Sequence, residues 1–137
     1  MRTKVFILVI LLLSIFSCEK WDLKHDLFGK WKIFASSGGI HGQGDNYDFD
    51  YMYLEKKSNY RFIRNDTIIE KGSFNLIDYN NASSLGDYAI EFSPKNRIKT
   101  GAGHITGQPM IIQIITKDSI FLYDGWIDGF GYYFEKQ

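Results

Sequence analysis

Apolar and polar residues alternate along most of this chain, which is the pattern of strands that bury one face. We expect eight strands separated by clusters of Gly, Asn, Asp and Pro. Their predicted ranges are 30–35, 47–55, 60–64, 67–76, 87–92, 110–116, 119–123 and 130–136. Asn65-Asp66 is expected to form a tight hairpin, because both residues tolerate positive φ. Pro94 is expected to end the fifth strand, because proline cannot donate to a ladder.

Strands with hairpin-like connections and almost no helical periodicity predict an all-β fold, as a sandwich or an up-and-down barrel. The composition agrees, because aromatic residues make up 17% of the chain and favour strands. Closure removes the exposed strand edges that invite aggregation. We therefore predict one domain at residues 27–137, an eight-stranded antiparallel up-and-down barrel.

The N-terminus has a different pattern, with the basic residues Arg2 and Lys4 before an apolar run from Val5 to Phe16. This run is shorter than the roughly 20 apolar residues that a spanning helix needs. Its length and its basic flank fit a secretory signal peptide. Ile15-Phe16-Ser17-Cys18 then resembles a bacterial lipobox.

The lipobox resemblance implies a signal peptide at 1–17, cleavage before Cys18, and a lipidated tether at 18–26. Diacylglyceryl and N-acyl (palmitate-type) chains on Cys18 would anchor the protein, because stable attachment needs more than one chain. Glu19-Lys20 and Asp22 loosely resemble export signals of surface lipoproteins in the Bacteroidota, so we expect a lipid-anchored protein of the bacterial outer membrane. Cys18 is the only cysteine, so no intrachain disulfide is possible. The alternative is an ordinary signal peptide or N-terminal anchor with an incidental cysteine.

A second resemblance starts at Leu27-Phe28-Gly29-Lys30-Trp31, which is similar to the Gly-x-Trp opening of lipocalins and related barrels. Later segments resemble the lipocalin-like (calycin-type) domains of small Bacteroidota lipoproteins. These segments are residues 51–54, 60–63, 71–74, 118–122 and 133–136. Avidin-like barrels share a similar opening, so the subfamily stays open.

The lipocalin resemblance also implies a late arginine packed over the signature tryptophan, but this chain has no arginine after Arg97. Lys136 ends the last strand, which is expected to run antiparallel beside the first. We therefore predict a barrel-closing group of Gly29, Trp31 and Lys136, with a cation–π contact worth roughly 0.5–2 kcal/mol. The alternative is that Trp31 is plain core that closes one end of the barrel.

Alternate loops of an up-and-down barrel gather at one end, and three of the four loops at one end are long and rich in glycine. They are residues 36–46, 95–109 and 124–129, beside the tight turn at 65–66. Binding residues concentrate on loops held by a rigid scaffold, so this end is the predicted mouth. Its candidate ligand-binding residues are His41, Tyr47, His104, Tyr123, Trp126 and Phe130. A barrel of this size holds side chains or one small ligand.

Other chemistries find little support. His41, His104 and Asp45 are a minimal zinc set without a motif spacing, and solvent-exposed histidines are the simpler interpretation. Asp45, Asp48 and Asp50 lack the Gly and distal Glu of an EF-hand calcium loop. No catalytic or phosphate-binding motif is present. The equal numbers of basic and acidic residues, 16 each, exclude a strongly basic nucleic-acid footprint.

The sequence therefore predicts a membrane-anchored binding protein rather than an enzyme, with no metal or other cofactor. The leading hypothesis is a small, largely apolar ligand held in the barrel. The main alternative is an interaction or inhibitor module of the cell envelope with a side-chain-filled barrel. A purely structural surface lipoprotein is a third possibility.

Overall fold

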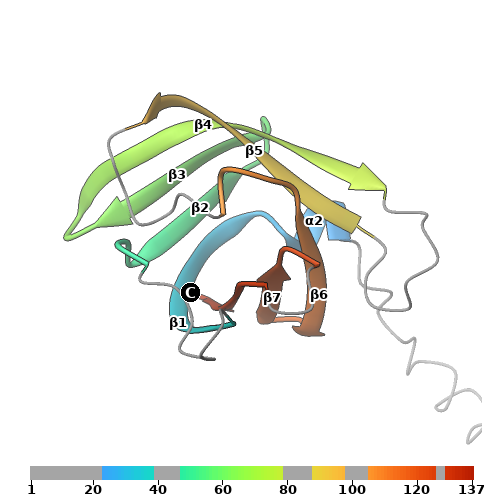
Figure 1. Ribbon diagram of the computed structural model, residues 1–137. Helices are drawn as coiled ribbons and strands as arrows, with labels where there is room; N and C mark the ends of the chain where they lie inside the picture. The colour runs from blue at the N-terminus through green and yellow to red at the C-terminus, as the bar shows by residue number, and fades with distance from the viewer. Residues whose placement is uncertain (1–22, 39–46, 79–87, 98–104, 126–128) are drawn as a thin grey trace, which may run out of the picture.

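The computed structural model describes residues 23–38, 47–78, 88–97, 105–125 and 129–137. Eight strands form a closed antiparallel barrel in sequence order, and the last strand pairs with the first (Figure 1). The elements are α2 (Leu23–Asp26), β1 (Gly29–Ser37), β2 (Tyr51–Glu55), β3 (Asn59–Arg64), β4 (Thr67–Asp78), β5 (Tyr88–Arg97), β6 (Met110–Thr116), β7 (Ser119–Tyr123) and β8 (Gly131–Lys136). The predicted all-β barrel of eight antiparallel strands is confirmed.

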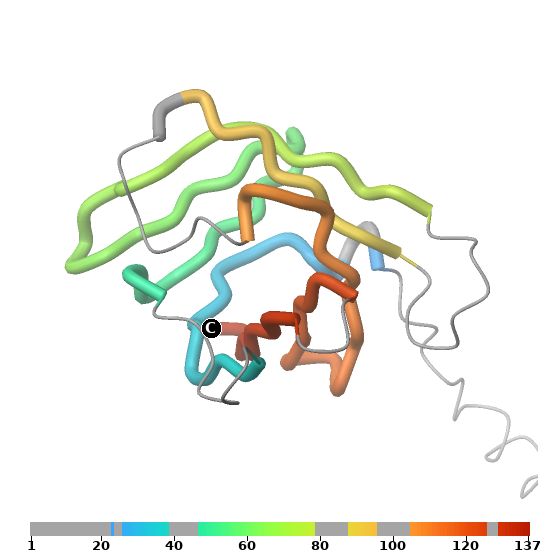
Figure 2. The backbone as a smooth tube through the Cα atoms, in the orientation of Figure 1, coloured from blue at the N-terminus to red at the C-terminus, as the bar shows by residue number. Residues whose placement is uncertain are grey.

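The strands form two curved layers. Figure 2 shows β3, β4 and β5 arched over the part of the barrel made by β1, β6, β7 and β8. Side chains alternate between the interior and the outside, as the buried Met52 and Leu54 on β2 and the buried Ile120 and Leu122 on β7 illustrate. One hydrophobic core therefore fills the space between the layers.

The hairpin turn predicted at Asn65-Asp66 is confirmed. Asn65 has φ 48° and Asp66 has φ 58°, which is the left-handed conformation that the turn requires. Asp50 Oδ2 accepts a hydrogen bond of 2.8 Å from the Asn65 backbone N–H. The turn is thus held to the segment that precedes β2.

Two strand boundaries differ from the prediction by more than two residues. The second strand begins at Tyr51 rather than residue 47. Phe49 is buried in the core, and the Asp50 backbone still bonds to both neighbouring strands, because its N–H donates to Ile63 O and its O accepts from Ile33 N–H. The fifth strand continues through Pro94 to Arg97. Pro94 pairs with Gly72 beside a register shift in β4, and β5 pairs with β6 only as far as Ile90. A proline is tolerated next to such an irregularity.

A short helix, α2, lies where the sequence predicted only tether. Its Leu23 and the following Leu27 are buried in the core cluster, so this segment belongs to the domain. Leu27 O accepts a hydrogen bond of 2.8 Å from Trp31 Nε1. No helix among the described residues has the length and hydrophobicity to cross a membrane.

Candidate functional site

The predicted barrel-closing group of Gly29, Trp31 and Lys136 lies at the end of the barrel that carries α2. Trp31 is fully buried and pairs in register with Lys136. Lys136 Nζ lies 5.4 Å from the Trp31 ring centroid and donates a hydrogen bond of 2.5 Å to Asp26 O. Gly29 has φ 135°, and a Cβ there would lie 3.2 Å from Lys136 Cε. The contact that the sequence allowed between Lys136 and Trp31 is present, and Trp31 is also core.

At the opposite end are the β1–β2, β3–β4, β5–β6 and β7–β8 connections, as the strand order requires. This is the predicted mouth. Three of its candidate residues, His41, His104 and Trp126, lie outside the described residues, as does the lipidation candidate Cys18. The others, Tyr47, Phe130 and Tyr123, have defined positions.

Tyr47 and Phe130 are partly buried and pack against the core. The ring centroid of Tyr47 lies 6.2 Å from that of Phe49. The Phe130 backbone N–H donates a hydrogen bond of 3.0 Å to Asp124 Oδ2. Both residues therefore cover the core at the predicted mouth.

Tyr123 lies on the outer face of β7, not inside the barrel. Its neighbour Leu122 is fully buried, and strand alternation then turns Tyr123 outward. The Tyr123 ring stacks on that of Phe121, with 5.3 Å between centroids and an interplanar angle of 14°. The sequence analysis assigned Tyr123 to this end of the barrel and did not assign it to a face of the strand.

Asp124 organises the predicted mouth, and the sequence analysis missed it. Asp124 Oδ2 accepts hydrogen bonds from Phe130 N and, at 3.3 Å, from Gln108 Nε2. A Cβ at Gly129 would lie 1.7 Å from Asp124 Oδ1, and a Cβ at Gly38 would lie 1.7 Å from Gly129 O. The ends of β1, β7 and β8 thus meet through two glycines and one carboxylate. The available signal was an aspartate directly after a strand, in a glycine-containing loop.

Aromatic rings fill the barrel interior towards this end. The ring centroid of Phe49 lies 4.5 Å from that of Phe62 on β3 and 6.3 Å from that of Phe134 on β8. Phe92 of β5 continues the cluster, 5.7 Å from Phe62. Ile105, from the β5–β6 connection, is fully buried. Phe49 therefore bridges strands that are not neighbours in the barrel.

One polar pair is buried among these rings. Tyr60 donates a hydrogen bond of 2.8 Å from its hydroxyl group to Glu70 Oε1. Tyr60 is fully buried and Glu70 is 2% exposed. The register shift between Phe62 and Ile63 in the β3–β4 ladder leaves both Ile69 and Glu70 buried. Strand periodicity gives no warning of this, because it would turn one of these two residues outward.

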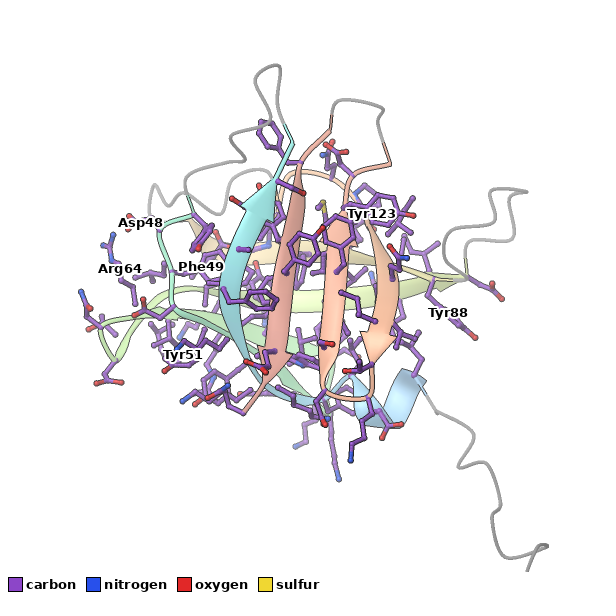
Figure 3. All side chains as sticks on the ribbon, turned by 90° about the horizontal axis from the view of Figure 1, so that it is seen from below. Asp48, Phe49, Tyr51, Arg64, Tyr88 and Tyr123 are labelled. Atoms are coloured by element: carbon purple, nitrogen blue, oxygen red, sulfur yellow. The ribbon has the colours of Figure 1, made fainter. Side chains whose placement is uncertain are left out.

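The outer aromatic row, which consists of Phe34, Phe121, Tyr123 and Tyr133, lies outside β1, β7 and β8. Phe121 and Tyr133 stack with centroids 4.3 Å apart, and Phe34 lies 5.9 Å from Tyr133. Phe34 is 54% exposed, while the other three are partly buried. Figure 3 shows β1, β8 and β7 turned towards the viewer, with Tyr123 near the end of β7.

Gly131 makes the outer aromatic row possible. A Cβ at this position would lie 2.2 Å from Phe121 Cζ, so the ring covers the bare backbone of β8. Phe121 is thereby held flat between Tyr133 and Tyr123, and the row presents ring surface to solvent.

Metal chemistry has no support among the described residues. No group of three or more His, Cys, Asp or Glu residues is placed to hold an ion there. Asp48 instead forms an ion pair with Arg64, and Asp50 holds the Asn65 turn (Figure 3 labels Asp48 and Arg64). Asp45, His41 and His104, which the sequence analysis considered as metal ligands, lie outside the described residues.

Comparison of the chain with protein-family models, curated proteins and solved structures found no match. The lipocalin-like resemblance therefore stays a prediction from the sequence, and the barrel fold stands on its strand order alone.

Proposed function

We propose that this protein is a lipid-anchored, non-catalytic binding module of the bacterial envelope, which binds a protein partner on its outer aromatic row. The barrel is the scaffold for that surface, and its interior is filled by side chains. This is the alternative that the sequence left open beside a barrel that holds a small apolar ligand.

The position of Phe49 favours a filled barrel over a barrel that holds a ligand. It leaves the β1–β2 connection, enters the interior and packs between Phe62 of β3 and Phe134 of β8. Protein interiors are close-packed, so rings that meet across a barrel of this size take the space that a ligand would need. The packing of Tyr47 and Phe130 against the same cluster supports a covered end.

The outer aromatic row supports a protein partner. Aromatic residues are enriched at protein interfaces, where their large rigid surfaces contribute much of the binding energy. Phe34 is a large apolar side chain more than half exposed on a strand, and its ring neighbour Tyr133 joins it to Phe121 and Tyr123. Packing among the rings holds them in place, so little side-chain entropy is lost on binding.

The anchor rests on the sequence of the first eighteen residues. A basic start, a short apolar run and Ser17-Cys18 fit export and lipidation. A lone cysteine in an exported chain is accounted for by the lipid, and the anchored protein is assigned to the outer membrane.

One observation favours the small-ligand alternative. The Tyr60–Glu70 pair is a polar group within an apolar interior, and ligand sites combine apolar walls with a few such groups. Under this alternative, the ligand would displace Phe49 to reach the pair.

Photo-crosslinking in the native envelope tests the proposal. Benzoylphenylalanine in place of Phe34 should give one discrete protein adduct, and Tyr133→Ala in the same chain should remove it. The control places the probe at Lys71, an exposed residue on β4 away from the outer aromatic row. Equal adducts at both positions, or none at Phe34, would contradict the proposal. A native mass spectrum with a reproducible small-molecule adduct, lost on denaturation, would favour the ligand-binding alternative.

A further inference from the structure

We propose that the barrel stands on the membrane with its α2 end, and that the tip of the β6–β7 hairpin contacts the lipid surface. This tip consists of Ile114, Ile115, Thr116, Lys117 and Asp118. The inference rests on the lipid proposed for Cys18, and it adds the orientation of the domain and a second, noncovalent membrane contact.

The length of the tether sets the first constraint. Cys18 lies five residues before Leu23, which is buried in the core as part of α2. An extended chain spans at most about 3.6 Å per residue, so Leu23 lies within about 18 Å of the lipidated residue. The end of the barrel that carries α2 is therefore held against the lipid surface.

Lys136 joins α2 directly to the hairpin tip. Its Nζ donates a hydrogen bond to Asp26 O of α2, and its backbone N–H donates one of 2.8 Å to Asp118 O. Figure 3 shows α2 and the turn between β6 and β7 at the same, lower end of the strands. A membrane that holds the lipid on Cys18 would therefore lie on the same side of the barrel as this tip.

The tip has the side chains that a lipid interface favours. Ile114 is 41% and Ile115 51% exposed, two of the five large hydrophobic residues that are exposed among the described residues. Both lie beyond Ile112, the last β6 residue that pairs with β5 among the described residues. Apolar side chains at such a tip can enter the boundary between headgroups and acyl chains.

Three lysines are exposed at the same end of the barrel as these isoleucines. The Lys117 side chain is 81% exposed, and its Nζ lies 3.9 Å from Asp118 Oδ2. Because both side chains are exposed, this ion pair is too weak to hold the ammonium group in one position. Lys56 and Lys57 are exposed in the β2–β3 turn at the same end of the barrel. Long basic side chains at a membrane bury their aliphatic stems and keep the charged group among the lipid headgroups. The acidic residues Asp78 and Asp118 are exposed at the same end as these lysines.

A thiol-attached fluorophore measures this orientation. Once Cys18 carries lipid, a cysteine introduced elsewhere is the only free thiol in the chain. The full chain with Ile115→Cys would be purified from membranes, labelled with NBD and reconstituted into vesicles of phosphatidylethanolamine and phosphatidylglycerol. The matched control is Ile68→Cys, which replaces an isoleucine that is 41% exposed at the start of β4, at the opposite end.

The label at position 115 should show a blue-shifted emission in vesicles and lose most of its intensity to a quencher attached to lipid headgroups. The label at position 68 should show neither change. Lys117→Cys is the second probe of the tip, in case position 115 tolerates labelling poorly. Equal quenching at the two ends, or stronger quenching at 68, would overturn the orientation while leaving the anchor intact. An intact mass without acyl chains would overturn the anchor as well, so the two failures are distinguishable.

Discussion

Lys136 on the last strand holds its ammonium group 5.4 Å from the centre of the Trp31 ring on the first strand. The same group donates a hydrogen bond to Asp26 O, so one side chain joins β8, β1 and α2. Replacing Lys136 therefore tests how much these contacts stabilise the closed end of the barrel.

We expect Lys136→Met to lower the free energy of unfolding by about 1–2 kcal/mol, because it removes a cation–π contact and a charge-assisted hydrogen bond. Urea denaturation of the mature domain measures this loss. Lys117→Met is the control, since that side chain is largely exposed, and it should change stability by less than about 0.5 kcal/mol. Equal effects would show that Lys136 contributes little to closure.

We expect Tyr60→Phe to lower the free energy of unfolding by about 1–3 kcal/mol, because it takes a donor from a buried carboxyl group. The same denaturation assay measures it, with Tyr53→Phe on the outer face of β2 as the control. An unchanged stability would mean that the hydroxyl group contributes nothing to the satisfaction of Glu70.

We expect Gly131→Ala to destabilise the domain by about 1–3 kcal/mol, as is typical of overpacking. The added methyl group would enter the space of the Phe121 ring and break its stacking on Tyr133. Phe121→Ala in the same chain should recover part of this loss. A double variant less stable than the sum of its parts would argue against this clash.

We expect Cys18→Ser to move the protein from the membrane fraction to the soluble fraction, because the acyl chains proposed for Cys18 would provide the attachment. Fractionation and intact mass measure the change. Ser17→Ala keeps a small residue before the cysteine and serves as the control. Unchanged fractionation of Cys18→Ser would rule out the lipid as the anchor.

Local patterns predicted much of the fold. The alternation of residues such as Tyr60 and Phe62 located β3, and the Asn65-Asp66 pair located its turn, since both depend on a few neighbouring residues. Pro94 does not end β5 as its residue type predicts, because whether a strand tolerates proline depends on the ladder beside it. The sequence alone does not show that β5 pairs with β6 only over its first residues.

The site was harder to predict, because it depends on contacts between distant segments. The strand order correctly predicted which loops share one end of the barrel. It did not predict that the Tyr123 ring lies on the outer surface, beside Phe121. The position of Phe49 between Phe62 and Phe134 depends on the closure of the whole barrel, so residues 47–50 looked like the start of a strand. The role of Asp124 likewise depends on Gly38 and Gly129, which meet it only in the folded domain.

The pairing of β1 with β8 has a consequence for how this chain reaches its folded state. Asp26 and Lys136, which meet at the closed end, are 110 residues apart in sequence. We expect contacts of this separation to form late, because the entropy of closing a long loop is lost before the contacts are gained. If the chain is exported as proposed, β1 would cross the membrane first and keep an unpaired edge until Gly131–Lys136 had followed it. A chain interrupted before Gly131 would leave the edges of both β1 and β7 open to pairing with other polypeptides.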